Sequence, residues 1–418
     1  MWQGGGVLGR SPTHRLDDSP KAGPEEGEIR HTQSVRVLYS FPHPLGRPGV
    51  GTTALHQVRG LAAQGADVQV VCPSCSVDPG PGVDVVELMR LGGRRVPLRG
   101  IGVERAWRLH DRRVARLIGR DRRPADVVHT WPLGALESLE AARARNILGA
   151  REVPNTHTAT AYSEAAVEAF TTGVRAQRGE SHAYNPTRLA REEAEYQAAG
   201  VLLVPSDAVA ASFLDRGVPE ARLGRHQYGY DPDTFWSADR DGGPFSAVIV
   251  GRGEPRKGLH YALQAWRDSG AGEHGSLTLY GEIGGSYRTF LKPLLAAPGV
   301  RVSGFATDVA SVMRSADALI LASVEEGSAL VTYEAQASGC VLLVSSATGA
   351  RVRHGEDGLV HAPRDVSTLT QQLTSVITDE ALRERLRAAS LEAARELTWA
   401  DAGRRLLQVY ESRLRRPA

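Results

Sequence analysis

An α/β protein with two doubly wound parallel sheets in tandem is the fold class that the sequence predicts. Apolar runs of strand length recur along the chain with helical patterns between most of them, and such alternation is typical of parallel strands joined by crossover helices. A join rich in Gly, Pro and Asp, residues 228–244, separates two series of these runs. The length of 418 residues and the 41% hydrophobic content suffice for two ordinary cores. We therefore expect two Rossmann-like sheets.

The expected strands can be taken in chain order. The first series comprises 35–41, 67–72, 84–89, 126–131, 151–155 and 201–206, and the second comprises 245–251, 276–281, 300–305, 317–323 and 340–346. Between the last two strands we expect a helix from Ala329 to Ala337, with Ser328 as its N-cap and Gly339 as its stop signal. Residues 380–415 also have helical periodicity, with basic residues at the end.

These signals predict four segments. Residues 1–33 lack apolar periodicity and are expected to form a disordered extension. A first Rossmann-like domain is expected at 34–235, and a second at 236–392. Residues 393–418 are expected to form a C-terminal helix.

Charge and hydropathy exclude several function classes. The net charge of +2 gives no strong nucleic-acid signal, and the arginines at 94–123 and in the terminal "RLRR" are typical of solvated helix faces. No run approaches the length of a membrane span, and the N-terminus lacks the apolar core of a signal peptide. A cytoplasmic enzyme is the resulting expectation, with peripheral membrane contact and a homodimer left open. The Arg- and Ala-rich, Lys-poor composition suggests an actinobacterial source.

Cys72 and Cys75 have the spacing of a redox dithiol or of half a zinc site. A structural zinc needs four ligands and no second pair is present, while the residues after Cys75 are typical of a loop and not of a helix. Incidental thiols in a reducing compartment are the expectation. No Asp-x-Asp pair follows a strand, so no metal site is predicted.

The stretch "SVEEGSALVTYEAQASG" at 323–339 surrounds the start of a predicted helix with carboxylates. Backbone N–H groups of Ala329 and Leu330 would point out of the helix N-terminus, which favours a phosphate. Glu326 and Glu334 would flank that point as acceptors for hydroxyl groups. Phosphate and hydroxyls together indicate a nucleotide sugar, whereas the simpler interpretation is a solvated helix face with dipole partners.

Basic residues follow the first strand of the second series in "GRGEPRKGL". Arg252, Arg256 and Lys257 lie there on a Gly-rich turn, where they could clamp a diphosphate. Only three of the 50 basic residues are lysine, so a lysine here favours a site that needs a compact charge. A solvated loop is the alternative.

The first series offers glycines and histidines after its strands. Gly49 and Gly51 in "GRPGVGTT" permit close backbone approach to a ligand, although the pattern is not a dinucleotide fingerprint. His157 in "PNTHTATAY" and His129 in "DVVHTW" both come at the end of a predicted strand. Taken alone, each histidine is more typical of a structural than of a catalytic residue.

The order of these features resembles the family-4 retaining glycosyltransferases of the GT-B fold. The resemblance covers Val35 to Leu414, and its most specific part is the E-x7-E pattern from Glu326 to Glu334, followed by Ala-x-Ala-Ser-Gly. The other segments that carry it are "VGRGEPRKG", "YGEIGG", "VSGFATD" and "LTWADAGRRLLQVYESRL".

The resemblance implies an acceptor site in the first domain, 34–235, and a nucleotide-sugar donor site in the second, 236–392. Glu334 would hold the ribose hydroxyls, and Glu326 would lie by hydroxyls of the donor sugar. Arg252 and Lys257 would contact the diphosphate, in place of a metal ion.

The resemblance also implies the remaining contacts. The helix start around Ser328, Ala329 and Leu330 would bind the distal phosphate, and His157 would sit by the transferred sugar. The two glycines of the first turn would line the cleft, and the last helix would cross back to the first domain.

The implied function is metal-independent, retaining transfer of a sugar, from a UDP- or GDP-linked donor, to a hydroxyl of a natural-product intermediate or a cell-envelope glycan. No cofactor other than the donor is expected. The sequence departs from the family where Gly327-Ser328-Ala329 replaces Gly-Phe-Gly and Pro48-Gly49 replaces Gly-Gly. A sugar-nucleotide epimerase, a phosphorylase and a non-catalytic sugar-nucleotide-binding subunit are the alternatives.

Overall fold

The computed structural model describes residues 1, 34–88, 90–91, 94–95, 102–174, 182–239 and 242–415. Met1–Gln33 and Ser34–Ala418 are two separate units, and every described helix and strand belongs to the second. The expectation of a disordered extension at 1–33 falls, apart from Met1, outside the described residues.

A seven-stranded parallel sheet occupies the N-terminal half, in the order β3-β2-β1-β6-β7-β8-β9. We call this sheet and its helices the first lobe. Its strands are β1 Arg36–Ser40, β2 Asp67–Cys72, β3 Val83–Glu87, β6 Val127–Thr130, β7 Leu148–Glu152, β8 Val201–Val204 and β9 Leu223–Arg225. The short pair β4 Arg90–Leu91 and β5 Arg94–Arg95 is antiparallel.

A six-stranded parallel sheet follows, in the order β12-β11-β10-β13-β14-β15. With its helices it forms the second lobe. Its strands are β10 Phe245–Val250, β11 Gly275–Tyr280, β12 Val300–Gly304, β13 Ala318–Leu321, β14 Val341–Ser345 and β15 Leu359–His361. The two parallel sheets confirm the predicted fold class.

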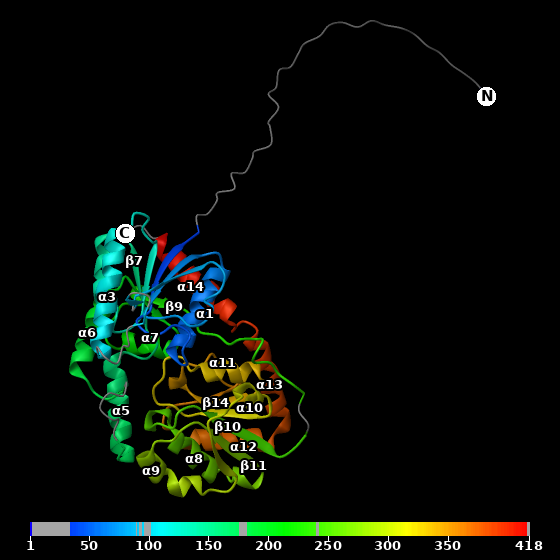
Figure 1. Cartoon of the computed structure of the whole chain (residues 1–418). Helices are drawn as coiled ribbons and strands as arrows, with labels where there is room; N and C mark the ends of the chain where they lie inside the picture. The colour runs from blue at the N-terminus through cyan, green and yellow to red at the C-terminus, as the bar shows by residue number, and fades with distance from the viewer. Residues whose placement is uncertain are drawn as a thin grey trace. The chain divides into compact units, whose positions relative to one another are not determined.

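Helices connect the strands, as Figure 1 shows. In the first lobe they are α1 Val50–Ala63, α3 Val103–Arg120, α4 Leu136–Ala144, α5 Thr158–Thr172, α6 Pro186–Ala198 and α7 Asp207–Leu214. In the second they are α8 Leu259–Asp268, α9 Gly285–Leu295, α10 Val309–Arg314, α11 Leu330–Ala337, α12 Val366–Thr378 and α13 Glu380–Ala394. The last helix is α14 Trp399–Leu414.

Strand burial explains why the apolar runs could be recognised. Every residue of β6, β8, β13 and β14 is buried, as expected for strands covered by helices on both faces. The strand order reverses at β1/β6 in the first sheet and at β10/β13 in the second. In such sheets ligands bind outside the carboxyl ends of the strands at these switch points.

The final helix returns to the first lobe, which confirms the predicted crossover. Leu406 and Tyr410 of α14 are buried in the core of the first sheet, and α14 lies beside α1 in Figure 1. A Cβ on Gly60 would lie 3.0 Å from Gly403 Cα, so glycines allow the two helices to touch. The segment with helical periodicity at 380–415 contains two helices, and residues 395–398 separate α13 from α14.

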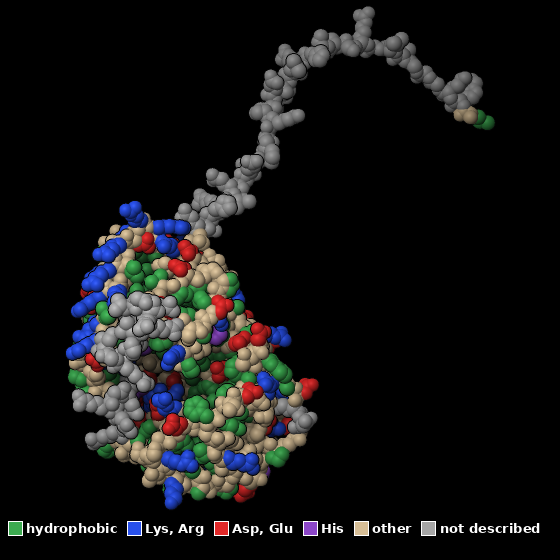
Figure 2. Space-filling view, viewed as in Figure 1, with side chains coloured by type: hydrophobic (Ala, Val, Ile, Leu, Met, Phe, Trp, Pro, Cys, Tyr) green, Lys and Arg blue, Asp and Glu red, His purple; other side chains and the backbone are tan. Residues whose placement is uncertain are grey.

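The arginine-rich stretch at 94–123 contains α3. Its Arg105, Arg108, Arg112, Arg116 and Arg120 are exposed, and Figure 2 shows a row of basic side chains along the edge where α3 lies. A solvated face was predicted for this stretch, and the described part confirms it. None of the described helices has the length and apolar character needed to cross a membrane.

Candidate functional site

The loop after β13 brings together charged residues that the sequence had separated. Lys257, at the end of the 3₁₀ turn Pro255–Lys257, forms an ion pair with Glu326. Arg256 Nη1 lies 3.6 Å from the second Glu326 oxygen. Glu326 also accepts a hydrogen bond from Ser323 Oγ at 3.3 Å. The turn after β10 and the loop after β13 therefore meet at the switch point of the second sheet.

Lys257 is electrostatically unusual. Burial and the charge of the nearby Arg256 lower its pKa to about 7, against the opposite influence of Glu254 and Glu325. Its ammonium group consequently changes charge near neutral pH. Gly258, which follows, has a φ of +64°, and a Cβ there would collide with the Ala322 backbone. Glycine thus lets the lysine turn pack against the end of β13.

Arg252 lies on the same turn but is more open. Its side chain is 73% exposed, and Nη1 lies 3.5 Å from Glu254. Arg252 and Lys257 line one hollow at the end of β10 together with Gly251, Gly253 and other residues. The structure therefore brings the two predicted diphosphate contacts together.

The helix start after Glu326 differs from the expectation. α11 begins at Leu330 with Ala329 as its N-cap, and Ser328 does not cap it. Ser328 Oγ instead shares a hydrogen bond with Tyr333 Oη at 2.7 Å, and the Ala329 N–H donates to Thr348 O at 3.1 Å. Of the two predicted phosphate donors, Ala329 is thus already used. The Leu330 N–H lies in the first turn, where a helix offers no internal acceptor.

Glu334 lies on α11 and is half-buried. Burial raises its pKa to about 7. Within the described residues its carboxyl group takes part in no hydrogen bond or ion pair, unlike that of Glu326. A carboxyl group with free acceptor capacity is what a hydroxyl ligand requires.

The predicted residues of the first lobe occupy varied positions. Gly49 precedes α1 with a φ of +88°, and a Cβ there would meet open space. A Cβ on Gly51 would lie 2.9 Å from Pro44 O, so Gly51 serves the packing of its own turn. His129 is fully buried and shares a 2.6 Å hydrogen bond with Tyr410 Oη, which makes it structural.

His157 is the N-cap of α5, where Nδ1 accepts a hydrogen bond from Ala159 N–H at 3.2 Å. Its ring packs on Tyr196 and Phe213 with centroid distances of 5.0 and 5.1 Å. Burial lowers the pKa of His157 to about 4, so the ring is neutral at pH 7. Its chain neighbours Thr156 and Thr158 line the adjacent cavity, whereas His157 is absent from the lining.

The two cysteines of "CPSC" lie at the end of β2 and in the following loop. Cys72 is buried, Cys75 is half-buried, and neither forms a disulfide. Cys75 Sγ donates to Val77 O at 3.1 Å. Among the described residues no group of His, Cys, Asp and Glu side chains is arranged to hold a metal ion.

Glu325 joins the two lobes, a role that the sequence analysis missed. It is 1% exposed and accepts a hydrogen bond from Thr156 Oγ1 at 2.8 Å. His182 Nε2 lies 3.1 Å from its other oxygen, and Arg256 Nη1 donates to its backbone oxygen at 3.0 Å. Hydrogen bonding to His182 and the charge of Arg256 outweigh burial and lower the pKa of Glu325 to about 2. The only sequence signal was the doubled glutamate.

Backbone contact reinforces this junction. A Cβ on Gly327 would collide with the Pro154 backbone oxygen, so only glycine allows this approach. Ser206 Oγ donates a hydrogen bond to Gly327 O. The ends of β7 and β8 thus touch the loop after β13.

A second junction lies along α5, which extends from the first lobe beside the second (Figure 1). Glu168 of α5 accepts a hydrogen bond from Arg364 Nε at 2.8 Å and lies 3.2 Å from His260 Nε2. Tyr261 Oη donates to the same carboxylate. The lobes are therefore also held together along α5, away from the Glu325 junction.

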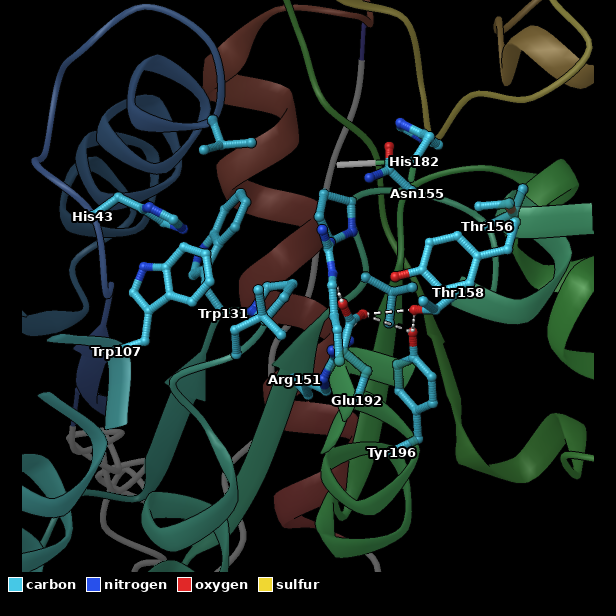
Figure 3. Close-up of a pocket in the computed structure, with 18 of the residues that line it drawn as sticks. His43, Trp107, Trp131, Arg151, Asn155, Thr156, Thr158, His182, Glu192 and Tyr196 are labelled. Carbon is cyan, nitrogen blue, oxygen red and sulfur yellow. Dashed lines mark hydrogen bonds and ion pairs between the residues drawn. The ribbon is translucent and has the colours of Figure 1, made fainter. Parts of the chain in front are cut away.

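A cavity of about 320 Å³ opens beside the Glu325 junction. Thr156 and Arg256 belong both to its lining and to the junction. Figure 3 shows His43, Trp107 and Trp131 on one side of the cavity and Asn155, Thr156 and His182 on the other. The cavity is thus formed by the first lobe and reaches the turn that carries Lys257.

Comparisons with curated proteins give relatives over part of the chain. Over 178 residues the chain is 33% identical to a glycogen synthase of Mycobacterium tuberculosis, which covers 40% of this chain and 42% of that protein. A D-inositol 3-phosphate glycosyltransferase of Corynebacterium kroppenstedtii is 32% identical over 114 residues, covering 26% of this chain and 25% of that protein. The chain spans less than half the length of these curated relatives.

Solved structures share the fold along most of the chain. Sucrose-phosphate synthase from Thermosynechococcus elongatus has a TM-score of 0.67 at 18% identity, covering 90% of this chain and 98% of that one. Anabaena HepE, solved in complex with UDP, has a TM-score of 0.64 at 14% identity, covering 90% and 100%.

Two family profiles divide the chain between them. "Glycosyltransferase Family 4" matches residues 48–234, and "Glycosyl transferases group 1" matches residues 244–379. Each profile matches within one lobe, and the order is that of the two sheets. The chain belongs to the family-4-like glycosyltransferases of the GT-B fold.

Proposed function

We propose that the protein transfers a sugar from a nucleoside-diphosphate sugar to a hydroxyl group of an acceptor, with retention of configuration at the sugar. The observation that carries this proposal is the Lys257–Glu326 ion pair at the end of β10 and β13, with a first-lobe cavity directly beside it. A donor at the switch point of the second sheet and an acceptor in the cavity would then be neighbours.

The leaving group sets the main chemical demand. Arg252 and Lys257 are proposed to neutralise the departing diphosphate, with the Leu330 N–H at the start of α11 as a further donor. No resident cofactor or metal is required in this scheme, because Arg252 and protonated Lys257 supply the positive charge that neutralises the diphosphate. Lys257 is held in position by Glu326 before the donor arrives.

The carboxyl groups are proposed to bind hydroxyls. Glu334 would accept from the ribose, since no described residue bonds its carboxyl group, and Glu326 would accept from the donor sugar. His157 is proposed to act beside the transferred sugar as a neutral side chain. Gly49 would line the cleft, because the space beyond its Cα is open.

The proposed reaction needs no protein nucleophile. The acceptor oxygen attacks the anomeric carbon from the face that the diphosphate leaves, the bond from that carbon to the phosphate oxygen breaks, and the acceptor proton passes to the diphosphate. The same face is used for entry and departure, so the configuration is retained. UDP is the favoured nucleotide, in keeping with the HepE complex, and the cytoplasm is the proposed location.

Calorimetric titration with UDP-, GDP-, ADP- and dTDP-sugars tests the donor site. Wild type is expected to bind one nucleotide selectively, and Glu334→Ala to bind it about tenfold more weakly, because a hydrogen bond to a charged group is lost. Glu396→Ala, which alters an 80% exposed carboxylate, is the matched control. The absence of binding to folded wild type would refute the transferase proposal. Donor conversion without acceptor would indicate an epimerase, and a requirement for free phosphate would indicate a phosphorylase.

A further inference from the structure

The cavity has one wall made of aromatic rings. Trp107 and His43 meet edge to face with centroids 5.5 Å apart, and Trp131 packs edge to face on Phe41 at 5.2 Å. Trp131 Nε1 donates to Tyr39 Oη at 2.7 Å, so its N–H is already used. Burial lowers the pKa of His43 to about 4, which leaves that ring uncharged at neutral pH. This wall offers apolar ring surface and no charge.

The charged side chains of the lining are paired with one another. Arg151 Nη2 lies 3.3 Å from Glu192 Oε2 and 3.0 Å from Glu195 Oε2. Arg188 Nε donates to Glu192 at 2.7 Å. Arg256 Nε lies 3.2 Å from Glu254 Oε2, and Arg256 Nη1 also contacts Glu325. Each arginine that the structure describes in the lining thus already has a carboxylate partner.

Pairing of this kind disfavours an anionic ligand. A phosphate in the cavity would have to compete with buried carboxylates for the arginines, and separating a buried ion pair is costly. It would also lie close to Glu192, which is 4% exposed. An uncharged ligand meets neither penalty.

Polar groups suited to a neutral ligand remain. The Tyr162 hydroxyl lines the cavity and is buried, and its proton has no acceptor among the described residues. The Asn185 backbone N–H lies beside the oxygen. Burial raises the pKa of Tyr162, so at neutral pH the hydroxyl keeps its proton and can donate it to an uncharged oxygen.

We infer that the acceptor is an uncharged, hydroxyl-bearing ring compound that lays one apolar face on Trp107, beside His43, and receives a hydrogen bond from Tyr162. The cavity volume of about 320 Å³ is at the small end of ligand pockets and suits one or two rings. A neutral glycoside and a phenolic compound share this chemistry, whereas a phosphorylated polyol does not. The inference rests on the proposed transferase function and specifies its acceptor.

Matched pairs of acceptors test the inference on the full chain. Phenyl glucoside is compared with its 6-phosphate, myo-inositol with its 3-phosphate, and naphthol with phenyl glucoside. Release of nucleoside diphosphate is measured with the donor that calorimetry identifies, and acceptor binding is measured in the presence of that diphosphate. We expect the uncharged member of each phosphate pair to have a kcat/KM at least tenfold higher. Naphthol against phenyl glucoside then distinguishes a phenolic from a sugar acceptor.

Two results would overturn the inference. Equal or better use of the phosphorylated member would show that the paired arginines do bind anions. Failure of every uncharged ring to bind at millimolar concentration would show that the aromatic wall is not a binding surface. In both cases intact donor binding would leave the transferase proposal standing, whereas loss of donor binding by wild type would refute the transferase proposal itself.

Substitutions of Trp107 test whether the preference for an uncharged acceptor depends on the aromatic wall. Trp107→Leu is expected to raise the acceptor KM at least tenfold and to leave the donor affinity unchanged, while Trp107→Phe restores most of the acceptor affinity. Phe170→Leu, at a 92% exposed ring of α5 that is absent from the lining, is the control. Equal acceptor KM values for wild type and Trp107→Leu would contradict the inference.

Discussion

The two lobes face each other with surfaces of opposite character. At the ends of β10 and β13 the second lobe presents two basic side chains in different environments. Lys257 has a pKa of about 7, and Arg252 is largely exposed. Beside them the first lobe presents a cavity of rings and fully paired ions. The side chains of Lys257 and Arg252 can turn towards a ligand whose negative charge increases during the reaction. Arginines that already pair with carboxylates suit a ligand that is only bound and does not gain charge. Under the proposed function, this difference lets one site hold two unlike substrates, a donor and an acceptor.

Replacing Lys257 is expected to give the largest effect, because it removes a basic side chain on which the difference between the two lobes depends. Lys257→Ala is expected to reduce kcat by about 10²- to 10³-fold, because a fixed positive group beside the leaving diphosphate is lost. Steady-state rates measure the effect. Lys292→Ala, at an exposed lysine of α9, should be neutral. A variant with wild-type rates would remove Lys257 from the proposed mechanism.

The pH dependence of donor binding tests the same charges without a mutation. The Lys257 cation is present below its pKa of about 7 and lost above it, so affinity should fall as pH rises. The Glu334 carboxylate is present above its pKa of about 7 and lost below it, so affinity should also fall as pH decreases. A bell-shaped profile near pH 7 is expected, with limbs approaching about tenfold per pH unit.

Variants assign the two limbs of that profile. Lys257→Arg keeps a positive charge at all accessible pH values and should flatten the alkaline limb. Glu334→Gln should flatten the acidic limb. A flat profile for wild-type binding between pH 5 and 9 would contradict both assignments.

A substitution in the Glu325 junction is expected to change kcat less than Lys257→Ala does. Glu325→Gln keeps the shape of the side chain but loses the charge that Arg256 and His182 face. We expect kcat to fall about tenfold, because charge-assisted hydrogen bonds that hold Thr156 are weakened, with donor affinity changed less. Glu396→Gln is the exposed control. Loss of donor affinity with unchanged kcat would mean that Glu325 belongs to the donor site and not to the junction.

The α5 junction should matter least. Arg364→Ala removes a partly exposed partner of Glu164 and Glu168, for which a loss of about 1 kcal/mol in the free energy of unfolding is expected. Chemical denaturation measures this loss, and the donor affinity should stay as in wild type. A large catalytic defect would show that this distant contact controls the cleft.

Sequence patterns predicted the fold because parallel strands buried on both faces leave continuous apolar runs. Strands β9 and β15, of three residues each, are too short to produce such a signal. The helical periodicity at 380–415 corresponds to two helices, between which residues 395–398 form a break. The domain limits that the sequence suggests remain predictions.

At the candidate site, local chemistry could be predicted more reliably than contacts across the chain. The family resemblance implied that Lys257 and Glu326 belong to one site, and the structure pairs them at the carboxyl ends of the adjacent strands β10 and β13. Ser328 was wrongly predicted as the N-cap, because Thr348, from a later segment, takes the Ala329 N–H. The bond between Glu325 and Thr156 spans 169 residues, and no local pattern encodes such a distance.

The return of α14 to the first lobe determines when that lobe can be finished during synthesis. Its core includes Leu406 and Tyr410, and the Tyr410 hydroxyl bonds the buried His129. In a nascent chain the core beside α1 therefore stays incomplete until the ribosome has released residues about 180 positions beyond the last strand of that sheet, Leu223–Arg225. The second lobe, which needs no later segment for its sheet, can close first. The part of the protein made earliest is thus completed last.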